Sequence, residues 1–95
     1  MKISWTPQAK ISYFNIIEYL QEEWTDKEIK KFAHKTEVIL KLISKNPKVF
    51  IRSGKKDIHK GFITKQISLY YKIEKEGVVL LTFWNNSQSP DKLRI

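Results

Sequence analysis

Hydrophobic residues recur with a helical period in the first half of the chain. Within residues 7–24 the apolar side chains of one stripe recur at intervals of four, three, one, three and four, which places them on one face of a helix. Thr6 followed by Pro7 is typical of a helix start, because threonine caps free amides and proline needs no donor at the first helical position. We therefore expect a helix over 7–24 whose core stripe is formed by Ala9, Tyr13, Ile16, Ile17, Leu20 and Trp24.

A second helix is expected directly after the first. Thr25 and Glu28 have the spacing of a capping box, in which each residue satisfies a backbone donor of the other. Asn46-Pro47 ends the helix, because proline disfavours helical backbone in the residue before it. The short link predicts an antiparallel helical hairpin, and the second stripe consists of Ile29, Phe32, Ala33, Thr36, Ile39, Leu40 and Ile43.

After residue 47 the period changes to two. Residues 67–74 alternate between apolar and polar side chains, as in a half-buried strand, and Glu76-Gly77 offers a tight turn. Residues 78–84 are apolar on both faces, which indicates a central strand. Residues 58–64 are expected to form a third strand. Because Lys65-Gln66 lacks the usual turn residues, one long bent strand is the alternative.

The expected elements define an α+β fold. With a short edge strand over residues 2–5, the order is β-α-α-β-β-β, a helical hairpin packed on a small antiparallel sheet. The chain has 95 residues, of which 41% are hydrophobic, enough for one core. We expect one domain over residues 1–95.

Composition excludes several classes of site. The chain contains no cysteine and two isolated histidines, so we expect no disulfide, thiolate, metal site or cofactor. The absence of cysteine fits a reducing cytoplasm. The longest apolar run is too short to cross a bilayer, and the first residues lack a secretory signal. No common catalytic motif is present.

The charge distribution predicts a polyanionic partner. The formal net charge is +8, and residues 48–95 carry 10 basic and 4 acidic side chains against 8 and 6 in residues 1–47. The stretch with the densest positive charge contains several basic residues and a single acidic residue, Asp57. As a phosphate-binding rim it would consist of Lys48, Arg52, Lys55, Lys56, Lys60 and Lys65, and the alternative is a solvated surface of no special function.

Two residue types near this stretch are candidates for chemistry. His59 is a candidate general acid or base, because histidine has the ordinary pKa nearest to neutrality. Tyr70 and Tyr71 lie on opposite faces of their strand, and the alternation assigns Tyr71 to the core and leaves Tyr70 open. His34, off the stripe of the second helix, receives no role.

Five segments in order resemble the RelE/ParE toxin superfamily. They are Ile3-Ser4-Trp5-Thr6-Pro7-Gln8-Ala9, Ile16-Ile17-Glu18-Tyr19, Asn46-Pro47, Tyr70-Tyr71-Lys72-Ile73 and the stretch from Phe83 to Leu93. The resemblance covers nearly the whole chain. It implies the family's fold and the toxin of a type II toxin-antitoxin module, of the kind associated with plasmid stabilization and growth inhibition. Its partner would be a cognate acidic antitoxin.

The resemblance implies two alternative targets. RelE-like members cleave messenger RNA on the ribosome, and for this activity the site would consist of His59, Lys60, Lys65 and Tyr70. ParE-like members poison DNA gyrase. Ser68 and Ser87 occupy positions that are often basic in the superfamily, and serine cannot stabilise a phosphodiester transition state as guanidinium does. This favours the ParE-like alternative, with a ribonuclease second and a non-catalytic binding module third.

Overall fold

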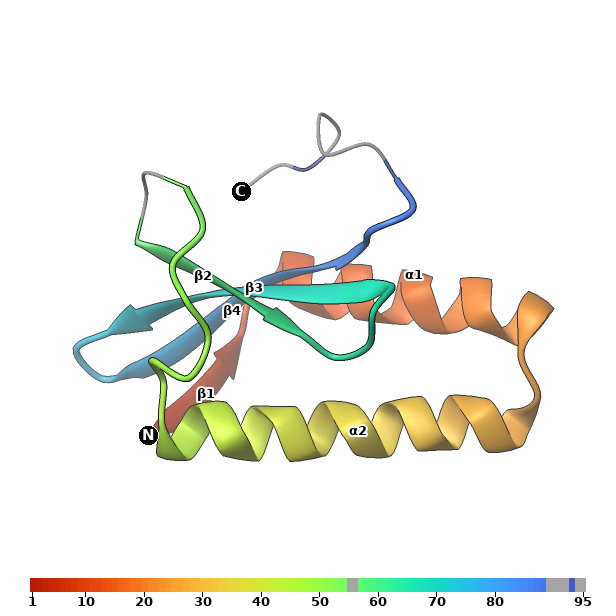
Figure 1. Cartoon of the computed structure of the whole chain (residues 1–95), viewed down its shortest axis with the longest axis horizontal. Coiled ribbons are helices and arrows are strands. Elements are labelled where there is room, and N and C mark those ends of the chain that lie inside the picture. The colour runs from red at the N-terminus through yellow and green to blue at the C-terminus, as the bar shows by residue number, and fades with distance from the viewer. Residues whose placement is uncertain (55–56, 89–92, 94–95) are drawn as a thin grey trace.

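A computed structural model describes residues 1–54, 57–88 and 93 (Figure 1). Its elements follow the expected order and are β1 (Lys2–Trp5), α1 (Pro7–Glu23), α2 (Asp26–Lys45), β2 (Ile58–Phe62), β3 (Ile67–Glu74) and β4 (Gly77–Asn85). The predicted α+β class is confirmed. No helix in the described ranges is long and apolar enough to span a membrane.

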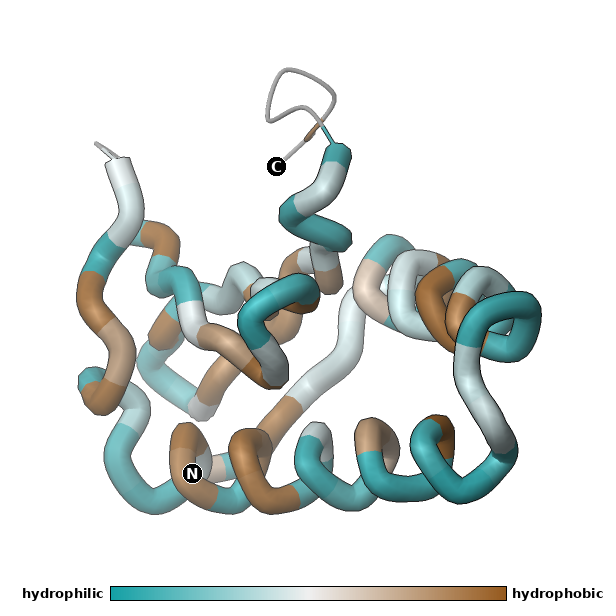
Figure 2. Tube along the Cα trace, turned by 45° about the vertical axis from the view of Figure 1, so that its right-hand side comes forward, coloured by the Kyte–Doolittle hydropathy of each residue, from teal (hydrophilic) through white to brown (hydrophobic). Residues whose placement is uncertain are grey.

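Both helices begin at the predicted caps. The Thr6 hydroxyl accepts a hydrogen bond from the Ala9 amide over 3.0 Å, and Pro7 is the first helical residue. At α2 the capping box is complete, because Thr25 Oγ1 accepts from the Glu28 amide while Glu28 Oε1 accepts from the Thr25 amide. The two helices run in opposite directions, and Figures 1 and 2 show them at an angle to one another.

The sheet has the order β1-β4-β3-β2 and is mixed rather than wholly antiparallel. β2, β3 and β4 pair antiparallel as expected, whereas β1 pairs parallel with β4, with Lys2 opposite Gly77 and Trp5 opposite Leu80. The helical hairpin explains the difference, since it returns the chain to the end at which β1 starts. There the Met1 amino group donates to the Ser44 carbonyl oxygen over 2.8 Å.

β2 and β3 form a hairpin, and the alternative of one bent strand is wrong. β2 ends at Phe62, two residues before the expected end. The Thr64 hydroxyl accepts hydrogen bonds from the amides of Gln66 and Ile67 over 3.2 and 3.1 Å. This threonine turn replaces the glycine, asparagine or proline turn that the sequence lacks.

The core lies between the helices and one face of the sheet. The residues of both predicted stripes except Ala33 contribute to it, together with alternate strand residues. Leu69 and Tyr71 on β3 and Leu80 and Phe83 on β4 are at most 2% exposed. A register irregularity opposite Tyr70 and Tyr71 lets Leu80 and Phe83 both reach the core although they are three residues apart.

Candidate polyanion-binding site

Residues 47–54, which we call the strap, lie along the outer edge of β2. The Tyr71 hydroxyl donates to the Pro47 carbonyl oxygen over 2.7 Å. Backbone hydrogen bonds join the Lys60 amide to the Ile51 carbonyl over 3.2 Å and the Ser53 amide to the Ile58 carbonyl over 2.6 Å. Since β2 is at the edge of the sheet, these bonds cover backbone groups that would otherwise be unpaired.

The strap fits closely because β2 carries a glycine, Gly61, next to its last residue. A Cβ atom added to Gly61 would lie 2.7 Å from Cδ2 of the Phe50 ring, closer than real contacts allow. Phe50 packs against the core from this position. Gly61 is therefore required by close packing of an aromatic ring against the strand backbone.

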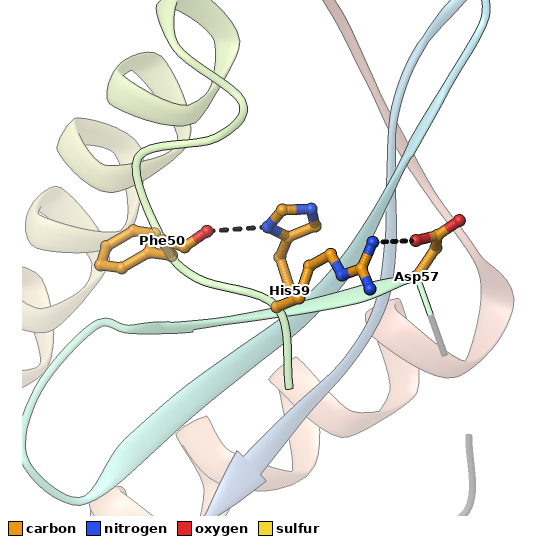
Figure 3. Close-up of polar contacts among 4 residues, drawn as sticks. Phe50, Asp57 and His59 are labelled. Atoms are coloured by element: carbon orange, nitrogen blue, oxygen red, sulfur yellow. Dashed lines mark hydrogen bonds and ion pairs between the residues drawn. The ribbon is translucent and has the colours of Figure 1, made fainter. Parts of the chain in front are cut away.

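His59 lies on the face of β2 that the helices cover. Its side chain is 7% exposed, and its ring stacks on Tyr71 with ring centroids 5.2 Å apart and planes 18° apart. His59 Nδ1 is 2.7 Å from the Phe50 carbonyl oxygen (Figure 3). Because a carbonyl oxygen can only accept, Nδ1 carries a proton.

Lys60 and Tyr70 lie on the opposite, helix-free face. They are paired across β2 and β3, and Lys60 Nζ is 5.7 Å from the centre of the Tyr70 ring and 5.4 Å from that of Phe62. Tyr70 is on its predicted face, but the expectation that it is open is wrong, because it is only 7% exposed. Phe62, which sequence reasoning missed, is 48% exposed, and its two-residue spacing from Lys60 was the available signal.

The four candidate ribonuclease residues therefore do not form one cluster. His59 faces the helices, whereas Lys60 and Tyr70 face away from them, because adjacent strand residues point to opposite faces. Lys65 is exposed in the turn between β2 and β3. The structure therefore places His59 and Lys60 on opposite faces of β2.

Ser68 and Ser87 make structural hydrogen bonds. Ser68 is fully buried, and its hydroxyl donates to Asn86 Oδ1 over 2.9 Å. The Asn86 side-chain amide donates in turn to the Lys65 carbonyl oxygen over 3.2 Å. The Ser87 hydroxyl donates to Asn85 Oδ1 over 2.8 Å. Sequence reasoning gave Asn86 no role, and nothing in its spacing signalled this bond.

The remaining basic candidates are divided between two places. Lys48 and Arg52 line a hollow of about 580 Å³ under the strap, together with Phe50, Ile51, Asp57, His59 and Ile73. Arg52 Nη1 is 3.0 Å from Asp57 Oδ1, and both side chains are largely exposed. Lys55 and Lys56 lie outside the described residues. Among the described residues, no group of three histidine, cysteine or acidic side chains could hold a metal.

Burial sets the electrostatics around the strap. It raises the pKa of the Tyr71 phenol, and the backbone amide of Phe50 beside the hydroxyl partly offsets that rise. Tyr71 therefore stays protonated at neutral pH and keeps its bond to Pro47. The strap is thus attached by a neutral donor that does not titrate in the physiological range.

Comparison with solved structures identifies the fold. The YoeB dimer from Staphylococcus aureus is 21% identical with a TM-score of 0.60, and the match covers 88% of this chain and 94% of that chain. A YoeB-YefM complex from the same organism is 20% identical with a TM-score of 0.58 and the same coverage. A copper-bound mutant toxin from Helicobacter pylori is 20% identical with a TM-score of 0.58, covering 92% and 96%.

These similarities show that the fold is RelE/ParE-like, as the five sequence segments implied. No protein-family model matches the sequence. No curated protein matches it either.

Proposed function

We propose that this protein is the toxin of a type II toxin-antitoxin module and that it acts on messenger RNA at the ribosome. The observation that best supports this proposal is the helix-free face of the sheet, where a lysine lies over two aromatic rings. The similarity to YoeB toxins supports the RelE-like alternative. It does not support gyrase poisoning, the alternative that the sequence analysis favoured, and we withdraw that preference.

The helix-free face has the chemistry of a single-strand binding surface. Phe62 is half exposed and offers a ring on which an RNA base can stack. Lys60, held between the rings of Phe62 and Tyr70, supplies a cation for the adjoining phosphate. Stacking on an aromatic ring requires an unpaired base, so this arrangement favours a single strand over a duplex.

The same module implies an antitoxin partner. The solved neighbours include YoeB in complex with YefM. In this chain α1 leaves Ile11 and Phe14 61% and 66% exposed, and the half that follows α2 is strongly basic. An acidic amphipathic antitoxin segment would cover apolar surface and pair with the lysines in one binding event.

Induced expression in bacteria tests the target. Pulse-labelling of protein and DNA synthesis should show translation falling first, and mapping of ribosome-associated mRNA should show cuts within codons. Lys60→Ala should weaken both effects, whereas Lys30→Ala, which removes an exposed lysine of α2, should not. DNA synthesis failing first, with a DNA-damage response, would contradict the proposal and restore the gyrase alternative.

Co-expression with a neighbouring short reading frame tests the module. A frame that encodes an acidic protein should yield a complex that copurifies at moderate salt and should relieve growth arrest. If the two proteins purify separately and growth arrest persists, the antitoxin part of the proposal is wrong.

A second candidate function is a binding module without catalysis. Two observations favour it. Ser68 is buried and its hydroxyl is hydrogen-bonded, and His59 lies on the opposite face of β2 from Lys60. This candidate predicts RNA binding and translation arrest without mRNA cuts. The mapping experiment above therefore separates the two.

A further inference from the structure

We propose that the hollow under the strap binds one ribonucleotide of a single-stranded RNA, with its phosphate at Lys48 and Arg52 and a ribose hydroxyl at His59. This site is separate from the helix-free face that carries Lys60, and it rests on the proposed function in taking RNA as the ligand.

The His59 ring is fixed in position and in protonation pattern. Stacking on Tyr71 sets its plane, and the 2.7 Å contact of Nδ1 with the Phe50 carbonyl oxygen places a proton on Nδ1. In the neutral imidazole the other nitrogen, Nε2, then carries a lone pair and accepts hydrogen bonds. His59 thus presents a positioned acceptor.

Nε2 is the His59 ring nitrogen that can face a ligand in the hollow. It has no hydrogen-bond partner among the described residues. Every fully buried side-chain nitrogen or oxygen atom of those residues does have a partner. His59 lines the hollow under the strap, and Nε2 is the ring nitrogen that its contact with Phe50 leaves for a ligand there. Figure 3 shows Nδ1 directed at Phe50 and the second ring nitrogen directed away from it.

The rim of this hollow favours an anion. Lys48 and Arg52 line it with one carboxylate, Asp57, which is hydrogen-bonded to Arg52 Nη1. Asp57 opposes an anion but also holds the guanidinium in place, and the other nitrogens of Arg52 remain as donors. Two cations against one carboxylate leave a positive balance, suited to a single phosphate rather than to a highly charged cluster.

An anion site with a fixed hydrogen-bond acceptor beside it selects a ligand that carries both a negative charge and a hydrogen-bond donor. A phosphodiester supplies the anion, and the ribose 2′-hydroxyl supplies a donor that DNA lacks. Phe50, Ile51 and Ile73 provide apolar walls, and about 580 Å³ lies within the usual range of small-ligand sites. The chemistry therefore fits one ribonucleotide.

The location allows a strand to contact both faces. His59 and Lys60 are consecutive residues of β2, which is the last strand of the sheet and is bordered by the strap. A strand bound at Lys60 and Phe62 would reach the hollow by passing around this edge. The hollow would then contact the sugar, whereas the aromatic rings of the helix-free face would contact the base.

The test compares a hexamer of RNA with the DNA hexamer of the same sequence on the full chain. One hydrogen bond to the 2′-hydroxyl should make RNA bind about two- to tenfold more tightly.

His59→Asn keeps an amide nitrogen where Nδ1 lies but has no Nε2, so the RNA preference should disappear. Replacing Lys48 and Arg52 by alanine should weaken binding of both hexamers and lower the salt slope by about 0.7, because one phosphate contact is lost. Lys30→Ala should change neither.

A measurement on the unsubstituted chain guards against misfolded variants. The ¹⁵N resonance of His59 Nε2 should shift on titration with the RNA hexamer and not with the DNA hexamer. Equal affinities with an unshifted Nε2 would overturn the hollow as a ribonucleotide site even if mRNA cuts are found. Failure to bind RNA together with absence of translation arrest would overturn the proposed function as well.

Discussion

The hydroxyl of Ser68 donates to Asn86 Oδ1 over 2.9 Å and thereby joins β3 to the turn that follows β4. Ser68 is fully buried there, in a position with no room for a long charged side chain. Ser68 is thus part of the internal structure of the sheet.

Ser68→Arg should destabilise the protein without creating a ribonuclease. Burying a guanidinium in place of a paired hydroxyl should lower the free energy of unfolding by about 3 to 5 kcal/mol. Ser68→Ala, which loses one hydrogen bond, should cost about 1 kcal/mol. Urea unfolding of both variants measures the difference, and an arginine variant as stable as the alanine variant would contradict the burial argument.

Gly61→Ala should displace the strap, because the added methyl group would collide with the Phe50 ring. We expect a loss of about 1 to 3 kcal/mol in the free energy of unfolding. In a Phe50→Ala background the same change should cost much less, since the obstructing ring is gone. The double-mutant cycle checks this, and additive effects would show that Phe50 is not the cause.

Tyr71→Phe should remove the bond that holds Pro47 and cost about 1 kcal/mol at neutral pH. The pH dependence has a definite sign. Because burial raises the pKa of Tyr71 in the folded state, its contribution is complete below the ordinary value of about 10 and is lost as pH rises through the folded-state value.

Alkaline unfolding measures this contribution. Burial also raises the pKa of Tyr13, so the wild type should lose stability above about pH 10 from both phenols. Tyr71→Phe should show a shallower loss over the same range. A variant with the unchanged alkaline slope would mean that Tyr71 does not titrate with unfolding.

Phe62→Ala should weaken binding of single-stranded RNA with little effect on stability. A stacked base is worth about 1 to 3 kcal/mol, so affinity should fall about five- to 150-fold. Phe62→Trp should retain binding, because it keeps a ring at the half-exposed position. Fluorescence anisotropy with a labelled hexamer measures both, and unchanged affinity in the alanine variant would exclude stacking on Phe62.

The local part of the fold could be predicted from the sequence. The helix starts at Pro7 and after Thr25 follow from capping chemistry, which depends on residues within one turn. The hairpin at Thr64 was harder, because a hydroxyl supplied the turn in place of glycine or proline. Parallel pairing of β1 was missed, since it depends on where the helices return the chain.

The candidate site was predicted less well because it depends on strand register. His59 pairs with Tyr71 across the two strands, and Lys60 pairs with Tyr70. These two cross-strand pairs therefore lie on opposite faces of the sheet. A list of residue types near one another in sequence cannot contain that information. The hydrogen bond from His59 to Phe50 depends on the path of the strap, which has no periodic pattern.

The parallel pairing of β1 with β4 affects the order in which the chain can fold. Residues 2–5 are synthesised long before residues 77–80, their partners in the sheet. Until β4 emerges from the ribosome, β1 has no strand to pair with among the described elements, and the face of α1 that packs on β4 stays uncovered. Such long-range contacts slow folding. During translation a nascent chain would therefore remain incompletely folded until almost all of these residues have been made.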